Sequence, residues 1–249
     1  MTGTRRLLTC CAMPGRRTFL GKTALVPAIG LTGASLLLAQ TAYAAALTKD
    51  QRDKMTPDEV MAQVKKGNER FRAGKLSTQD YLAQKRATAA GQYPAAVILS
   101  CIDSRTPAEI LLDARLGDTF NARVAGNIAN DDVLGSLEFA CAVAGAKLVL
   151  VMGHTACGAI KGAIDNAQLG HLTGLLAKIK PAVDATRYEG DRTSKNDAFV
   201  DEVARTNVRQ TVGAIRQRSE VLAGLEKEGK IKIVGSMYHL VGGRVEFLA

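Results

Sequence analysis

Residues 95–105 read AAVILSCIDSR, an unbroken apolar run that ends in a cysteine, an aspartate and an arginine. Pro94 precedes the run, and the short length of the run favours a strand over a helix. An apolar run without alternation is typical of a strand buried on both faces, as in a parallel sheet covered by helices. Similar runs predict further strands over residues 119–124, 147–152 and 231–238.

Helical patterns alternate with these runs. Residues 56–59 read TPDE, a capping box with proline at the first helical position, so a helix is expected to begin there with an apolar stripe from Val60 to Phe71. Further helices are expected over residues 77–90, from about Asp131, and over residues 199–215. Strands that alternate with helices predict an α/β fold, with a mainly parallel central β-sheet flanked by helices, in a single domain over residues 45–249.

Three metal-binding side chains follow two of the predicted strands. Cys101 ends the first buried run, and His154 and Cys157 follow the third run in the tetrapeptide HTAC, where the opening turn of a helix is expected to point both side chains the same way. The carboxyl ends of parallel strands share one edge of a sheet, so residues 53 apart in sequence can meet there. Two thiolates and an imidazole suit Zn²⁺, and three protein ligands leave a fourth position for water or substrate.

A carboxylate and a guanidinium distinguish this pattern from ordinary buried cysteines and a helix-start histidine, which are the alternative interpretation of Cys101, Cys157 and His154. Asp103 and Arg105 follow Cys101 in one tight turn. In a catalytic site, Asp103 can accept a hydrogen bond from a zinc-bound hydroxide while Arg105 holds the carboxylate in place and keeps it ionised. A structural zinc site has no use for such a pair.

These motifs resemble the two signatures of the beta-class carbonic anhydrases. The resemblance rests on Cys101-x-Asp103-x-Arg105, followed about 50 residues later by His154-x-x-Cys157-Gly158. It extends to Gln92-x-Pro94 before the first strand and to residues 123–127, RVAGN, after the second. It covers roughly residues 92–158 well, with a weaker echo at the last strand and Gly242-Gly243.

The resemblance implies one zinc ion per chain on Cys101, His154 and Cys157, with Asp103 and Arg105 as catalytic residues. It implies reversible hydration of carbon dioxide to bicarbonate and a proton by zinc-bound hydroxide, with Asp103 able to become a fourth zinc ligand in a closed form. Gln92 and the backbone amide of Gly158 are expected to bind substrate. Family members are dimers or larger assemblies whose N-terminal helices wrap on a neighbour, so a homodimer or higher homo-oligomer is expected.

Two departures and two rival functions accompany this resemblance. Ile98 stands where some members have a regulatory tryptophan, which argues against bicarbonate inhibition, and His239 follows Tyr238 where many members have an aspartate. The rival enzyme activity is hydrolysis of carbonyl sulfide or carbon disulfide. The rival of another class is a zinc-binding or redox-sensing module without catalysis, in which oxidised cysteines release the metal. Asp103 and Arg105 disfavour the module.

The N-terminal segment has the parts of a secretion signal. It begins with basic residues, continues in an apolar run over about residues 24–39 and reaches Ala42-Tyr43-Ala44, which suits signal peptidase. Residues 16–20, RRTFL, resemble a twin-arginine signal, which exports folded proteins. We therefore expect a cleavable leader over residues 1–44, a periplasmic or otherwise exported protein, and no membrane attachment once the leader is removed.

Charge and cysteine content agree with that division. The chain carries a formal charge of +9, but residues 1–46 hold five basic residues and no acidic one, which leaves +4 for the rest. That remainder gives no support to nucleic-acid binding, so no nucleic-acid partner is expected. Three cysteines remain beyond the leader, too few for the disulfide framework of a secreted protein. The arginines of the last long helix are interpreted as a solvated face: Arg205, Arg209, Arg216 and Arg218.

Overall fold

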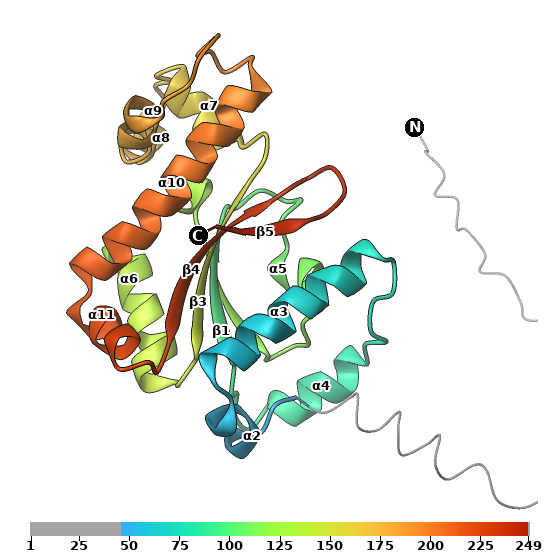
Figure 1. The fold of residues 1–249 in the computed structure, drawn as a ribbon. Coiled ribbons are helices and arrows are strands. Elements are labelled where there is room, and N and C mark those ends of the chain that lie inside the picture. Colours follow the sequence, from blue (N-terminus) through green and yellow to red (C-terminus); the bar gives the residue numbers. More distant parts are fainter. Residues whose placement is uncertain (1–45, 249) are drawn as a thin grey trace, which may run out of the picture.

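The computed structural model describes residues 46–248 and has one five-stranded sheet at its centre (Figure 1). The strand order is β2-β1-β3-β4-β5; the first four strands are parallel and β5 is antiparallel to β4. The strands are β1 (Ala96–Ser100), β2 (Thr119–Arg123), β3 (Leu148–His154), β4 (Lys232–Tyr238) and β5 (Val245–Leu248). The predicted α/β class with a mainly parallel sheet is confirmed.

Helices cover both faces of the sheet (Figure 1). One face carries η1 (Ala125–Asn127), α6 (Asp131–Glu138), η2 (Phe139–Val143), α7 (Gly158–Ile164), α8 (Gly170–Ala177), α9 (Lys180–Ala185), α10 (Asp197–Arg218) and α11 (Glu220–Lys227). The other face carries α2 (Lys49–Lys54), α3 (Pro57–Arg72), α4 (Tyr81–Thr88) and α5 (Ala108–Leu111). Within the described residues, no helix is both long and apolar enough to span a bilayer.

The side chains of β1 alternate between these two layers. Val97 and Leu99 belong to the core under α10, whereas Ala96 and Ile98 belong to the core under α3. Because both cores need apolar contacts, the strand must be apolar at every position, which explains its unbroken run. All five residues of β1 are buried.

Most predicted elements are present, with two differences at the sheet edges. The capping box at Thr56 forms and begins α3, and a shorter helix, α4, lies within the expected 77–90 segment. The strand predicted over residues 119–124 is not buried on both faces; as β2 it is an edge strand with partly exposed side chains. The other edge, β5, follows a turn through Gly242 and Gly243 and has no apolar run to mark it. The predicted leader over residues 1–44 lies outside the described residues.

The apolar stripe of α3 covers the chain's own sheet. Val60 and Val64 are buried against the core that holds Ile98 and Leu150, and Phe71 packs at its margin. The implied wrapping of this stripe on a neighbouring copy is therefore not needed to remove it from water.

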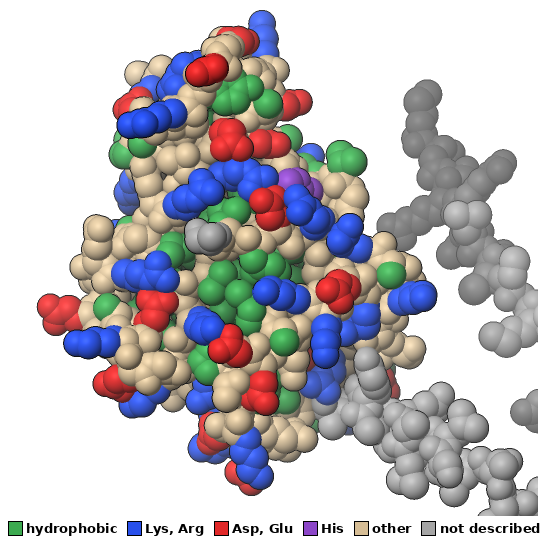
Figure 2. Space-filling model, in the orientation of Figure 1, with side chains coloured by type: hydrophobic (Ala, Val, Ile, Leu, Met, Phe, Trp, Pro, Cys, Tyr) green, Lys and Arg blue, Asp and Glu red, His purple; other side chains and the backbone are tan. Residues whose placement is uncertain are grey.

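The solvated face predicted on α10 is present at Arg209, Arg216 and Arg218, which are exposed. Arg205 departs from it, because its side chain is largely buried in an ion pair. Arg205 donates two hydrogen bonds, of 2.8 and 2.9 Å, to the carboxylate of Glu246 on β5, and its side chain is 17% exposed. His239 and Arg244 bond to the same carboxylate. Acidic, basic and histidine side chains gather over the region of β5 in Figure 2. Chiefly because of the Arg205 hydrogen bonds, the pKa of Glu246 is lowered to about 2.

Replacing Glu246 with Gln should make the stability of the protein less dependent on pH. A carboxyl whose pKa is lowered by folding stabilises the fold above its unfolded pKa of about 4.3, and this contribution is lost as the pH falls toward 2. After solvent screening we expect Glu246→Gln to cost about 1–2 kcal/mol of unfolding free energy at pH 7 and almost nothing near pH 2. Urea unfolding at both pH values measures this difference, and an equal cost at both would contradict it.

Candidate metal centre

Strand register brings the first two predicted ligands to one edge of the sheet. Ser100 of β1 pairs with Met152 of β3, so Cys101 emerges beside His154 at the carboxyl ends of the two strands. The sequence placed His154 on the opening turn of a helix, but the structure keeps it as the last residue of β3. Cys157 is the N-cap of α7, after a two-residue turn. The two ligands therefore converge through a strand end and a helix start.

The three side chains form a buried cluster that fits a metal ion. Their ligand atoms lie within 4.8 Å of one another, and Cys101, His154 and Cys157 are 4%, 1% and 1% exposed. The His154 Nδ1 lies 2.9 Å from the carbonyl oxygen of Thr155, so this nitrogen carries the proton. The Nε2 is then a bare acceptor, and it is buried without a hydrogen-bond partner. Two sulfurs and an imidazole nitrogen with a free lone pair are the donors that zinc prefers.

The two thiols are electrostatically unequal. A hydrogen bond from Cys157 holds the pKa of Cys101 well below its usual range, and the Gly126 amide, whose nitrogen lies 3.4 Å from the Cys101 Sγ, contributes. The same bond to the Cys101 thiolate, with burial, raises the pKa of Cys157. Because the Cys157 thiol donates this bond, binding of a metal by both sulfurs must release its proton.

Asp103 and Arg105 form the predicted pair beside the cluster. The Arg105 Nε and Nη2 donate to the two Asp103 carboxylate oxygens at 2.9 and 2.8 Å, and the Arg105 amide adds a third bond of 2.9 Å. These bonds hold the pKa of the Asp103 carboxyl well below its usual range. The Asp103 Oδ2 lies 3.9 Å from the His154 Nε2, so an ionised oxygen borders the metal position.

Two side chains that the sequence analysis did not single out fix the turns that carry the cysteines. Arg123, at the end of β2, donates from Nε to the carbonyl oxygen of Cys101 at 2.9 Å and from Nη2 to that of Asp103 at 2.5 Å. Asp201 of α10 accepts a hydrogen bond of 2.9 Å from the amide of Ala156, which has a left-handed φ of 54°. The RVAGN motif pointed to Arg123, whereas no local pattern links Asp201 to a turn 45 residues earlier.

The two predicted substrate-binding residues lie in different places. Gly158 is the exposed first residue of α7, directly after Cys157. Gln92 is exposed before β1, and the five-residue strand, about 16 Å long, separates it from Cys101. Within one chain Gln92 is therefore not brought to the metal cluster. Its role in substrate binding, like that of Gly158, stays a prediction.

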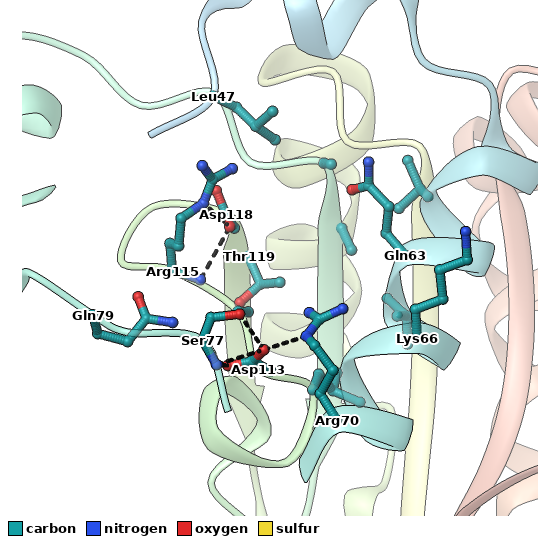
Figure 3. Close-up of a pocket in the computed structure, with 16 residues that line it drawn as sticks. Leu47, Gln63, Lys66, Arg70, Ser77, Gln79, Asp113, Arg115, Asp118 and Thr119 are labelled. Atoms are coloured by element: carbon teal, nitrogen blue, oxygen red, sulfur yellow. Dashed lines mark hydrogen bonds and ion pairs between the residues drawn. The ribbon is translucent and has the colours of Figure 1, made fainter. Parts of the chain in front are cut away.

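The cavity drawn in Figure 3 is separate from the metal cluster. It has a volume of about 310 Å³, lies between α3 and the amino ends of β1 and β2, and contains none of the three ligands. Asp113 lies at its edge, where its carboxylate accepts hydrogen bonds from Arg70 and from the backbone and hydroxyl of Ser77. These contacts join α3 to the α5–β2 loop, so we assign Asp113 a structural role.

Comparisons with known proteins agree with one another. A family model described as carbonic anhydrase matches residues 96–245. Carbonic anhydrase 2 of Mycobacterium tuberculosis is 38% identical over 187 residues, which cover 73% of this chain and 87% of that protein. A beta-carbonic anhydrase structure from Aspergillus fumigatus matches with a TM-score of 0.59 and 30% identity, over 66% of this chain and 79% of that one. A structure from a study of two tetrameric beta-carbonic anhydrases of Sordaria macrospora matches with a TM-score of 0.57 and 25% identity, over 65% of this chain and 83% of that chain.

Two cysteine variants test the ligand assignment. Cys157→Ser should reduce the zinc content from about one per chain to near zero after dialysis against a chelator, because a serine hydroxyl does not replace a thiolate as a zinc ligand. Cys141→Ser is the matched control, since Cys141 is also buried but lies in η2 and has its pKa raised to about 12 by burial alone. Metal analysis in which Cys141→Ser loses zinc and Cys157→Ser keeps it would refute the assignment.

Proposed function

The chain belongs to the beta-class carbonic anhydrase family, and on that basis we propose that it catalyses the reversible hydration of carbon dioxide at one zinc ion held by Cys101, His154 and Cys157. The observation that carries this proposal is the bare, buried Nε2 of His154 between two cysteine sulfurs, with an ionised carboxylate at its border. Structural zinc sites use four protein ligands, whereas catalytic sites keep one position for water or substrate.

Asp103 and Arg105 would orient the reaction. Zinc held by these three donors supplies a Lewis acid that makes water nucleophilic near neutral pH. Arg105 donates two hydrogen bonds to the Asp103 Oδ1 and one to the Oδ2. The Oδ2 therefore keeps a lone pair that can accept a hydrogen bond from the nucleophile. Since Asp103 stays ionised, it accepts that bond and does not donate one. The nucleophile would then keep its lone pair directed at carbon dioxide.

The competing use of Asp103 is as a fourth zinc ligand in a closed form. Arg105 opposes this use because its charge-assisted hydrogen bonds would be weakened if the carboxylate turned toward the metal. Arg105 would therefore keep the fourth position available, and the dyad would determine whether the site is active.

Stopped-flow hydration of carbon dioxide by the purified, zinc-loaded protein tests the proposed activity. We expect Arg105→Ala to retain zinc and to lose about 100-fold or more in kcat/KM, in the range expected for a positioned acid–base group. Arg216→Ala is the matched control, because Arg216 makes the same two-point contact with Glu226 on another part of the molecule. Near wild-type activity of Arg105→Ala, with zinc bound, would show that the dyad is structural. Carbonyl sulfide, assayed in parallel, separates hydration from the rival hydrolysis.

We also propose that the mature protein is a homo-oligomer. The tetrameric Sordaria macrospora enzymes support this. In this chain Phe139 and Val143 are 52% and 74% exposed, and Phe139 packs edge-to-face against Phe120 of the edge strand β2. Exposed apolar side chains beside an open strand edge favour association. Light scattering on the protein used for the activity assay would contradict the proposal if it gave the mass of a monomer.

From the sequence of the leader, we propose that the protein is exported by the twin-arginine route and that residues 1–44 are removed. Replacing Arg16 and Arg17 with Lys should leave the precursor in the cytoplasm, because that route requires the paired arginines. Replacing Arg5 and Arg6 with Lys changes the same number of arginines in the leader and should leave export unchanged. Cell fractionation that finds the first variant matured in the periplasm at the normal level would exclude this route.

A further inference from the structure

Helix α10 contacts the backbone behind the first sulfur ligand. It runs beside β3 and β4 (Figure 1) and meets η1 through Asn207, which is 3% exposed. The Asn207 Nδ2 donates a hydrogen bond of 2.8 Å to the carbonyl oxygen of Gly126. The amide of the same glycine donates to the Cys101 Sγ at 3.4 Å. A side chain on α10 is thus connected to a zinc ligand through one residue.

Position 126 requires glycine for two reasons. Its φ of 69° lies in the left-handed region, and a Cβ at this position would stand 2.4 Å from the Ile179 Cδ1. The next residue, Asn127, is also left-handed, with a φ of 44°. Two consecutive left-handed residues are unfavourable for a free loop, so a contact that fixes their backbone has a strong effect on where the Gly126 amide points.

We propose that Asn207 is a positioning residue for the Cys101 ligand, acting through the Gly126 peptide. The inference rests on the proposed zinc ligands. An N–H directed at a thiolate withdraws electron density from the sulfur and fixes its position, as groups behind metal ligands commonly do. Asn207 therefore limits how strongly Cys101 donates to zinc, which keeps the metal a better Lewis acid than an unrestrained pair of thiolates would allow.

Two variants at Asn207 test this role. Asn207→Ala removes the side chain, and Asn207→Asp keeps its size while replacing the donor with an acceptor that repels the Gly126 carbonyl. Thr211→Ala is the control: Thr211 lies one turn further along α10, is 5% exposed, and borders the same cavity of about 450 Å³ as Asn207. The hydrogen bonds behind Cys101 come from Gly126 and Asn207 and not from Thr211, so truncation of Thr211 should leave the zinc ligands unaffected.

Three measurements report on the metal and not only on activity. Competition with a chromophoric chelator should give a zinc affinity reduced about 10- to 100-fold in both Asn207 variants, because the Cys101 sulfur is no longer held in position. In the Co²⁺-substituted proteins the sulfur-to-cobalt charge-transfer band should move to longer wavelength, because the thiolate is more electron-rich. The midpoint of the pH–rate profile should rise. Thr211→Ala should match the wild type in all three.

A purely structural role for Asn207 has a different signature. It would lower the melting temperature and leave the zinc affinity and the charge-transfer band of the folded variants unchanged, and that result would overturn the proposal. If Asn207→Ala does not fold, the isosteric Asn207→Asp decides by the same measurements. Failure of the proposed function is distinguishable, because a wild-type protein that binds zinc without hydrating carbon dioxide would refute the activity and leave the metal measurements valid.

Discussion

The parallel pairing of β1 with β3 is the constraint on which the metal centre depends. The register that sets Ser100 opposite Met152 places Cys101 and His154 at one sheet edge. A shift by one residue would reverse the side chains of β1 between the two cores, exchanging Val97 and Leu99 with Ala96 and Ile98. Because these two sets differ in volume and face different helices, the packing on both sides opposes such a shift. The ligand geometry is therefore protected by the whole apolar core.

The sheet alone does not complete the cluster, because each cysteine also adjoins a turn with left-handed backbone geometry. Ala156 and Gly126 both adopt left-handed conformations, one beside Cys157 and the other behind Cys101. Helix α10 contacts both turns, through Asp201 and Asn207. The two side chains are six residues apart on one rigid helix, so the relative position of the two turns is fixed by an element that carries no ligand itself. Such division between ligand and support is common in metal sites.

The sequence correctly predicted those features of the molecule that are encoded within one short segment. The apolar runs of β1 and β3, the capping box at Thr56 and the ligand motifs each lie within a short segment, and each is present in the structure. The family model and the relatives agree with the function that the motifs implied. The motifs succeed because a metal site fixes residue type as well as spacing.

Predictions were wrong or missing for features that depend on contacts between residues far apart in the sequence. Arg205 resembles a solvated residue in its helix, but Glu246 reaches it from β5, a strand with no apolar run of its own. The partial exposure of β2 follows from its place at the sheet edge, which its composition does not reveal. Asn207 did leave a signal: it is polar within the buried stripe of α10 that includes Val203 and Val208. A polar residue in such a stripe needs a partner, but the sequence does not say which.

The same long-range construction affects when the metal can bind. The ligand atoms come from three segments, and their support comes from η1 and α10, so the site exists only once the sheet and its covering helix are in place. Before a cation binds, the fold must bury the unpartnered imidazole nitrogen of His154, which opposes folding. Zinc gives this nitrogen a partner, so its binding free energy adds to the stability of the fold. Loading of a folded protein in a reducing compartment, before export by a route that accepts folded cargo, would keep both thiolates away from oxidants until the metal covers them. The proposed twin-arginine route would in this way suit the chemistry of the metal centre.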